Sequence, residues 1–163
     1  MLRIAILVGI ISLFTHPVTA QDFDVGLEAY TAGDYATALK EFQPLAEGGN
    51  VEAQYALAMM YRYGDGVSLD YVEAMRLFRV AASYGHPMAP NAISLMYLKG
   101  EGVSPDPEKA YLWSDIAAAT SFGSAVAAQL RDAIASELTP EQITNARNLS
   151  KTCTESGFID CGD

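Results

Sequence analysis

Basic side chains and histidine are scarce in this sequence. Its 163 residues include 10 Lys and Arg against 20 Asp and Glu, giving a formal net charge of −10, and only two His. Nucleic acids and anionic lipid surfaces are bound through clusters of positive charge, so the composition argues against both as partners. Most of the acidity serves solubility.

Catalytic motifs are missing as well. There is no Gly-x-Ser-x-Gly, no His-Glu-x-x-His, no Cys-x-x-Cys and no phosphate-binding glycine loop that ends in Lys-Ser or Lys-Thr. Once a predicted signal peptide is removed, His86 is the one histidine left, and no nucleophile adjoins it. We therefore expect no catalytic residue, no cofactor and no metal ligand, and we expect His86 to start a helix or pack in the core.

Cysteine occurs only at Cys153 and Cys161, close to the end of the chain. An even pair in an exported protein is typical of a disulfide, and we predict an intrachain bridge that pins the tail at residues 153–163. Its loop is short, so its entropic stabilisation is modest, about 2–3 kcal/mol. Two free thiols, or one intermolecular bond, are the alternatives.

The first 20 residues have the composition of an export signal. Arg3 precedes an apolar run at residues 4–14, and Val18 and Ala20 place small residues at the −3 and −1 positions of a cleavage site. An uncleaved anchor is the alternative, but about eleven helical residues rise only about 16 Å, whereas the bilayer core is about 30 Å thick. We predict cleavage after Ala20 and a periplasmic or secreted bacterial protein without a membrane span after cleavage.

A repeat of 36 residues organises the rest of the chain. Residues 64–67, Gly-Asp-Gly-Val, return at residues 100–103 as Gly-Glu-Gly-Val. The same period links Asp34 with Asp70 and Phe42 with Phe78 further upstream, and Ala74 with Ala110 downstream. A fixed period of this length is typical of a stacked repeat array.

The pattern of the segments predicts an all-α fold. Gly and Pro separate stretches of about 11–16 residues with helical spacing, and no β alternation is present. We expect an α/α superhelix, or solenoid, of about four stacked antiparallel helix pairs. Its repeat domain at 21–152 would contain units at 23–49, 50–85 and 86–123 and a degenerate terminal unit at 124–152.

Particular residues are expected to end and begin these helices. We predict left-handed turns at the glycines of the two loops, because glycine suits this way of ending a helix. The loops are not calcium or phosphate sites, because they lack the remaining ligands. Polar side chains with cap chemistry precede four predicted helices. The loop glycines are Gly64, Gly66, Gly100 and Gly102, and the predicted caps are Asn50, Asp70, Asp106 and Thr139.

Residues 49–85 carry a recognisable pattern. It reads Gly-Asn-x-x-Ala-x-x-x-Leu-Ala-x-x-Tyr-x-x-Gly-x-Gly-Val-x-x-Asp-x-x-x-Ala and closes with Ala-Ala-x-x-Gly. The next unit follows it, with Ser94 at a usual glycine position. The pattern resembles the Sel1-like repeat, a relative of the tetratricopeptide repeat with a longer hairpin loop. The resemblance is closest over 49–123 and weakest over 124–152.

The resemblance implies an α/α superhelix that binds proteins or peptides, and it implies that exported bacterial members are adaptors, regulators or host-contact factors. One cysteine-rich branch of the family is linked to penicillin binding or β-lactamase activity. The Ser-x-x-Lys signature and the paired cysteines of each unit that mark that branch are missing here.

The candidate binding surface follows by analogy with tetratricopeptide-like arrays, in which the first helix of each unit lines the concave face. The alternative for some of these residues is packing against the neighbouring unit. The groove candidates are Tyr55, Met59, Arg62 and Tyr63, followed by Asn91, Leu95, Leu98 and Lys99.

We therefore predict a monomeric protein–protein interaction module, an adaptor, scaffold or regulator that binds a peptide segment of another envelope or secreted protein. The alternatives are a β-lactamase-like, penicillin-binding or cell-wall enzyme, and a scaffold that self-associates through its end units.

Overall fold

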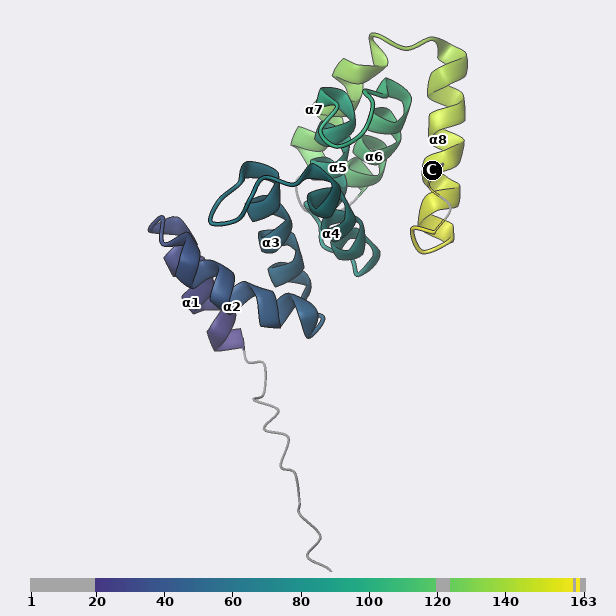
Figure 1. Cartoon of the computed structure of the whole chain (residues 1–163). Helices are drawn as coiled ribbons and strands as arrows, with labels where there is room; N and C mark the ends of the chain where they lie inside the picture. Colours follow the sequence, from purple (N-terminus) through teal and green to yellow (C-terminus); the bar gives the residue numbers. More distant parts are fainter. Residues whose placement is uncertain (1–19, 120–123, 160, 162–163) are drawn as a thin grey trace, which may run out of the picture.

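The computed structural model describes residues 20–119, 124–159 and 161, and these residues form helices and their connections without a strand (Figure 1). The predicted signal peptide lies outside them except for Ala20, the first residue of α1. The helices are α1 (Ala20–Thr31), α2 (Tyr35–Glu47), α3 (Val51–Tyr63), α4 (Tyr71–Ser83), α5 (Ala89–Lys99), α6 (Pro107–Ala119), α7 (Ser124–Ala135) and α8 (Pro140–Glu155).

Neighbouring helices pack in pairs, and the pairs stack side by side. Helices α1 and α2, α3 and α4, and α5 and α6 form three such pairs, and α2 against α3 and α4 against α5 join one pair to the next. The array runs from the purple end to the green end in Figure 1. The fold is an α solenoid, as the 36-residue period predicts.

The helix starts follow from cap chemistry. The Asn50 side chain accepts a hydrogen bond of 2.8 Å from the backbone N–H of Ala53, and the Asp70 carboxylate accepts two of 3.0 Å from the first turn of α4. Thr139 and Gln142 form a reciprocal capping box at α8. These bonds satisfy backbone donors that have no partner within a helix, and they confirm the predicted caps.

Each long hairpin loop touches the preceding unit through its second glycine. Gly66 has φ +73°, and a Cβ built there would lie 2.7 Å from Cβ of Tyr35, the first residue of α2. The equivalent glycine, Gly102, has φ +74° and would place a Cβ 2.8 Å from Cβ of Tyr71, the first residue of α4. Tyr71 follows Tyr35 by 36 residues, so the repeat preserves both sides of the contact. Only glycine combines this backbone conformation with so close an approach.

Small residues at the repeat positions let the helices approach. Ala38, Ala74 and Ala110, spaced by 36 residues, are all fully buried. Ser94, at the usual glycine position, is also fully buried, and its hydroxyl donates a 2.7 Å hydrogen bond to the carbonyl oxygen of Ala110. The extra hydroxyl is therefore accommodated by a partner in the facing helix.

The last unit departs from the predicted helix pair. Helices α7 and α8 both pack against α6 and make little contact with each other. The connection between α7 and α8 lacks the loop glycines. It therefore also lacks the contact that those glycines make with the preceding unit. Residues 110–114, at the centre of α6, are consecutively buried because α5, α7 and α8 enclose this helix. The sequence predicts one apolar stripe on α6 and does not predict this enclosure.

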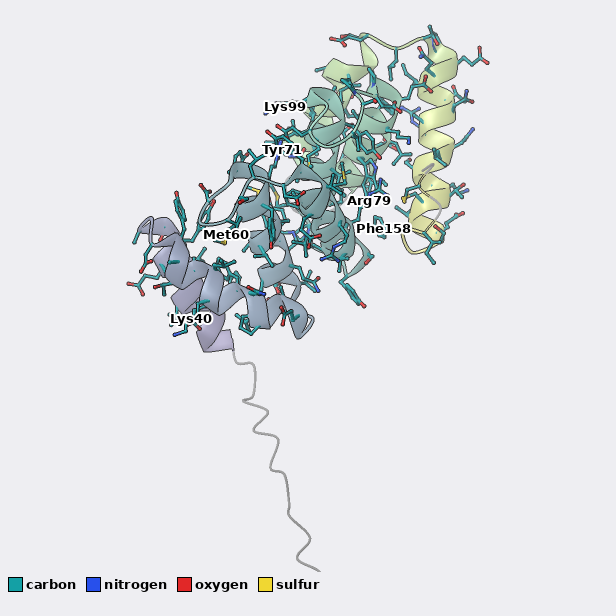
Figure 2. The ribbon with its side chains drawn as sticks, viewed as in Figure 1. Lys40, Met60, Tyr71, Arg79, Lys99 and Phe158 are labelled. Carbon is teal, nitrogen blue, oxygen red and sulfur yellow. A yellow bond between two sulfur atoms is a disulfide. The ribbon has the colours of Figure 1, made fainter. Side chains whose placement is uncertain are left out.

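The tail folds back onto α6. The predicted bridge between Cys153 and Cys161 is present and closes residues 153–161. Within this loop, Phe158 stacks on Trp113 of α6 with 6.0 Å between ring centroids and 19° between ring planes. Figure 2 shows Phe158 at the end of α8 on the side that faces the array. The disulfide thus holds an aromatic contact between the tail and the core.

We predict that Gly66→Ala lowers the free energy of unfolding more than Gly33→Ala does. Gly33 also has a left-handed φ of +81°, but a Cβ there meets nothing within 4 Å. The left-handed strain alone costs about 1–2 kcal/mol, and the collision with Tyr35 adds about 1–3 kcal/mol. Urea unfolding of the two variants measures the difference, and equal losses would show that the contact with Tyr35 does not hold the units together.

We also predict that Cys153→Ser with Cys161→Ser lowers stability by about 2–3 kcal/mol and exposes Trp113. Trp113 is the one tryptophan of the chain, so its fluorescence reports the loss of the contact with Phe158. Phe158→Ala with the disulfide intact is the control, which shifts the fluorescence while keeping the cross-link. An unchanged melting temperature in the double serine variant would contradict a stabilising role for the bridge.

Candidate functional site

An apolar groove lies between the first helices of the first two units. Phe23, Leu27 and Tyr30 of α1 form one wall, spaced i, i+4 and i+7, which places them on one helix face. Phe42 of α2 contributes to the lining, and its buried ring packs on Phe23 with 5.4 Å between centroids. The other wall comes from α3, through Glu52, Tyr55, Ala56 and Met59, and His86 completes the lining.

The groove has a volume of about 240 Å³. Pockets that enclose a small-molecule ligand usually measure about 300–1,000 Å³, so this groove is suited to one or two side chains.

Tyr55 is the best-fixed side chain of the groove. Its ring stacks on the imidazole of His86, with 4.1 Å between centroids and 12° between planes, and also contacts the ring of Phe78 at 5.4 Å. Burial raises the pKa of Tyr55. His86 stands in the turn between α4 and α5, where its Nδ1 accepts a 3.3 Å hydrogen bond from the backbone N–H of Met88. The second unit and the start of the third thus position these two rings together.

Burial also lowers the pKa of His86, against the opposing influence of Glu52. A base whose charged form is desolvated stays neutral to lower pH, so His86 adds no charge to the groove at neutral pH.

Tyr30 closes the far end of the groove. Its hydroxyl donates a 2.8 Å hydrogen bond to the carboxylate of Asp65, in the loop after α3. Burial raises the pKa of Tyr30, and the hydrogen bond to Asp65 raises it further. The first and second units are therefore linked by a polar contact that also holds one wall of the groove.

The next loop repeats this contact with a different residue. Glu101 follows Asp65 by 36 residues, and its carboxylate accepts a 2.7 Å hydrogen bond from Nε of Arg62 on α3. Arg62 is only 4% exposed. The prediction that Arg62 is an accessible cation of the groove is therefore corrected, because its guanidinium is buried in a bond between units and its charge is neutralised there.

The other predicted groove residues divide into three groups. Tyr55 and Met59 line the α1–α3 groove. Tyr63 is exposed, with its ring 5.5 Å from the guanidinium of Arg62, and Lys99 is exposed, 3.8 Å from Glu101. The residues predicted on α5 do not line the α1–α3 groove; Asn91, Leu95 and Leu98 are half-buried.

The α1 wall and the place of His86 in the groove were not predicted from the sequence. The helical spacing of Phe23, Leu27 and Tyr30 is a signal that could have found the wall. The first unit has a short loop without Gly-x-Gly-Val, so the loop motif gave no indication that α1 lines a groove. The stacking of His86 on Tyr55 joins residues 31 positions apart, and no local pattern indicates it.

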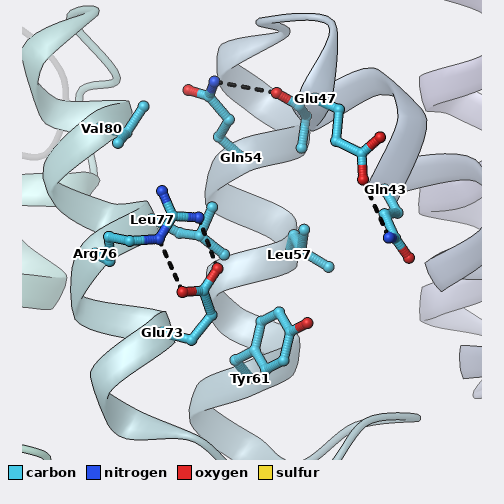
Figure 3. Close-up of a pocket in the computed structure, with 10 residues that line it drawn as sticks. Gln43, Glu47, Gln54, Leu57, Tyr61, Glu73, Arg76, Leu77 and Val80 are labelled. Carbon is cyan, nitrogen blue, oxygen red and sulfur yellow. Dashed lines mark hydrogen bonds and ion pairs between the residues drawn. The ribbon is translucent and has the colours of Figure 1, made fainter.

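A second cavity, of about 250 Å³, is lined by residues of α2, α3 and α4 (Figure 3). Its polar groups pair with one another. Arg76 bonds to Glu73 at 2.6 Å, Gln43 to Glu47 at 3.1 Å, and Gln54 to a backbone carbonyl at 3.2 Å. Glu73, Arg76, Gln43 and Glu47 thus pair within the protein, whereas the buried Oε1 of Gln54 has no hydrogen-bond partner among the described residues.

The comparison with protein families decides the identity of the repeats. The Sel1 repeat matches residues 51–86 and 88–119, which are the second and third helix pairs of the array. The chain is a Sel1-like repeat protein. Sel1-like repeats build interaction modules, so this chain has the general character of a protein–protein interaction module.

A solved structure has a similar fold. It is the crystal structure of a protective antigen present in uropathogenic Escherichia coli strains, which displays an SLR (Sel1-like repeat) fold. The TM-score is 0.77, with 24% sequence identity over 84% of this chain. The Sel1-like repeat protein described here covers 31% of that chain, and at this identity the likeness shows the fold alone. No curated protein matches the sequence.

Within the described ranges, no three His, Cys, Asp or Glu side chains are grouped so that they could hold a metal ion. Among the same residues, every helix is too short or too polar to cross a bilayer.

We predict an imidazole pKa below 6.5 for His86, since burial disfavours the imidazolium. The unfolded chain binds this proton more readily than the folded chain. Stability that depends on neutral His86 is therefore fully present above about pH 6.5 and lost as pH falls through the folded pKa.

NMR titration of the His86 ring measures this pKa. As the pH falls below neutral, His86→Asn should lose less stability than the unchanged protein does. Tyr55→Leu is the control, because it uncovers the imidazole and should move the pKa towards 6.5. A pKa at or above 6.5 in the unchanged protein would contradict the burial of His86.

Proposed function

We propose that this Sel1-like repeat protein is an exported, monomeric interaction module, and that its α1–α3 groove binds a peptide segment of another envelope or secreted protein. The observation that carries the proposal is the apolar lining of this groove, which is shared by two stacked units and has the size of one or two side chains. Such a module serves as an adaptor, scaffold or regulator rather than as an enzyme.

Export is supported by two features. Residues 1–20 have the composition of a cleavable signal, and the Cys153–Cys161 bridge is typical of proteins outside the reducing cytoplasm. The net negative charge favours a protein partner over nucleic acid.

The groove also has the residue types that anchor interfaces. Tyrosine is enriched among the residues that contribute most to binding, because it brings a large rigid ring with a polar tip. Tyr30 and Tyr55 stand on opposite walls, each held by a partner, and Met59 adds a flexible apolar side chain between rigid rings. A peptide side chain placed between the walls would contact pre-positioned groups, which lowers the entropic cost of binding.

We predict that Leu27→Asn weakens peptide binding at least about tenfold, whereas Val25→Asn leaves it unchanged. Leu27 and Val25 lie on the same helix and are 44% and 46% exposed, but only Leu27 lines the groove. Peptides selected on the purified protein from a random display library supply the ligands, and fluorescence anisotropy measures their affinity. Loss of an apolar anchor in a pocket costs about 1–3 kcal/mol, which corresponds to this change.

Circular dichroism and melting temperature must be the same for both variants. Equal affinities in the two variants would show that the peptides bind elsewhere and would refute the groove as the binding site.

A further inference from the structure

Both helices that form the walls of the α1–α3 groove carry exposed carboxylates. On α1, Asp24 and Glu28 are exposed and directly follow the lining residues Phe23 and Leu27. On α3, exposed Glu52 belongs to the lining itself. A segment bound between the two helices would therefore have negative charge on either side of it.

Few cations are present to balance these carboxylates. Residues 20–65 contain eight Asp and Glu but only two basic residues, Lys40 and Arg62. Arg62 is buried and bonded to Glu101, and Lys40 is an exposed residue of α2 outside the groove lining. His86 is kept neutral at pH 7 by burial. Asp65, in the loop after α3, accepts its hydrogen bond from the Tyr30 hydroxyl, which is not a cation.

The aromatic residues of the groove lining favour the same kind of ligand. The π face of an aromatic ring carries partial negative charge and attracts Lys and Arg within about 6 Å. Phe23, Tyr30 and Tyr55 present aromatic rings in the lining. The groove thus combines an apolar interior with aromatic walls and an acidic rim.

We infer that the occupant of the groove is a peptide segment with an aliphatic or aromatic anchor and a Lys or Arg within two residues of it. The inference rests on the proposed function and adds the chemical class of the partner. The anchor fills the space of about 240 Å³, and the cation reaches the rim formed by Asp24, Glu28 and Glu52. Successive residues of an extended chain are spaced by about 3.3 Å, which brings a neighbouring long basic side chain to either wall.

The test compares three sets of labelled 12-residue peptides that share the same central Leu or Phe anchor. The residues that flank the anchor are Lys and Arg in one set, Gln and Ser in the second, and Asp and Glu in the third. We expect the basic set to bind the purified protein at least about tenfold more tightly than the acidic set, a difference of about 1.4 kcal/mol. This preference should shrink in 1 M salt, where the Debye length is about 3 Å.

Charge-neutralised variants test whether these carboxylates cause the preference for basic over acidic peptides. Asp24→Asn, Glu28→Gln and Glu52→Gln combined should reduce the ratio between basic and acidic sets to about threefold or less. The matched control combines Glu137→Gln, Glu141→Gln and Glu155→Gln, which change the net charge equally at exposed residues of the far end of the array. The control should keep the full ratio, and Leu27→Asn should weaken all peptide sets together.

The outcomes separate the inference from the proposed function. Groove-dependent binding without a preference for basic flanks, or with a preference for acidic ones, overturns the inference and leaves the groove as a peptide site. Binding that Leu27→Asn does not affect, or no binding of any set, overturns both. A dimer that Leu27→Asn dissociates in light scattering would show that a second copy fills the groove, and would also overturn the inference.

Discussion

The structure depends on how each hairpin loop meets the unit before it. The second loop glycine packs against a tyrosine at the start of the preceding unit's second helix, as Gly66 does against Tyr35. The acidic residue beside it accepts a hydrogen bond from the preceding unit's first helix, as Asp65 does from Tyr30. Backbone proximity and a polar bond thus fix each unit relative to the last at two points. Sequentially local helix pairs become a stacked array through these contacts, in addition to apolar packing.

The groove is a consequence of the same contacts. The bond between Tyr30 and Asp65 holds α1 against the second unit, and the stack of Tyr55 on His86 holds α3 against the start of the third. Both walls are therefore positioned from outside their own helices. A surface fixed in this way keeps its shape before a ligand arrives, which distinguishes it from a loop that must become ordered on binding.

The period of 36 residues was sufficient to predict the helix pairs, the caps and the loop glycines, because these depend on local backbone chemistry and on repeated burial. Tyr55 and Met59 were assigned to the groove by analogy with tetratricopeptide-like arrays, and both line the α1–α3 groove. The period could not predict that Arg62 is buried, since that depends on Glu101 reaching across from the next unit. Nor could it predict that α1 and His86 line the groove, because contacts between units bring them there. The sequence likewise did not predict that α7 and α8 both pack on α6. These helices follow the spacing of the repeat but lack its loop.

The position of α8 has a consequence for the end of the array. Ala146 lies 36 residues after Ala110 and Cys153 lies 36 after Ala117, and both are buried against the preceding helices. Helix α8 therefore covers a flank of α6 and exposes polar residues on its other side, while the cross-linked tail returns to α6. The helix that completes the core thus presents polar residues to solvent where the apolar flank of α6 would otherwise be exposed.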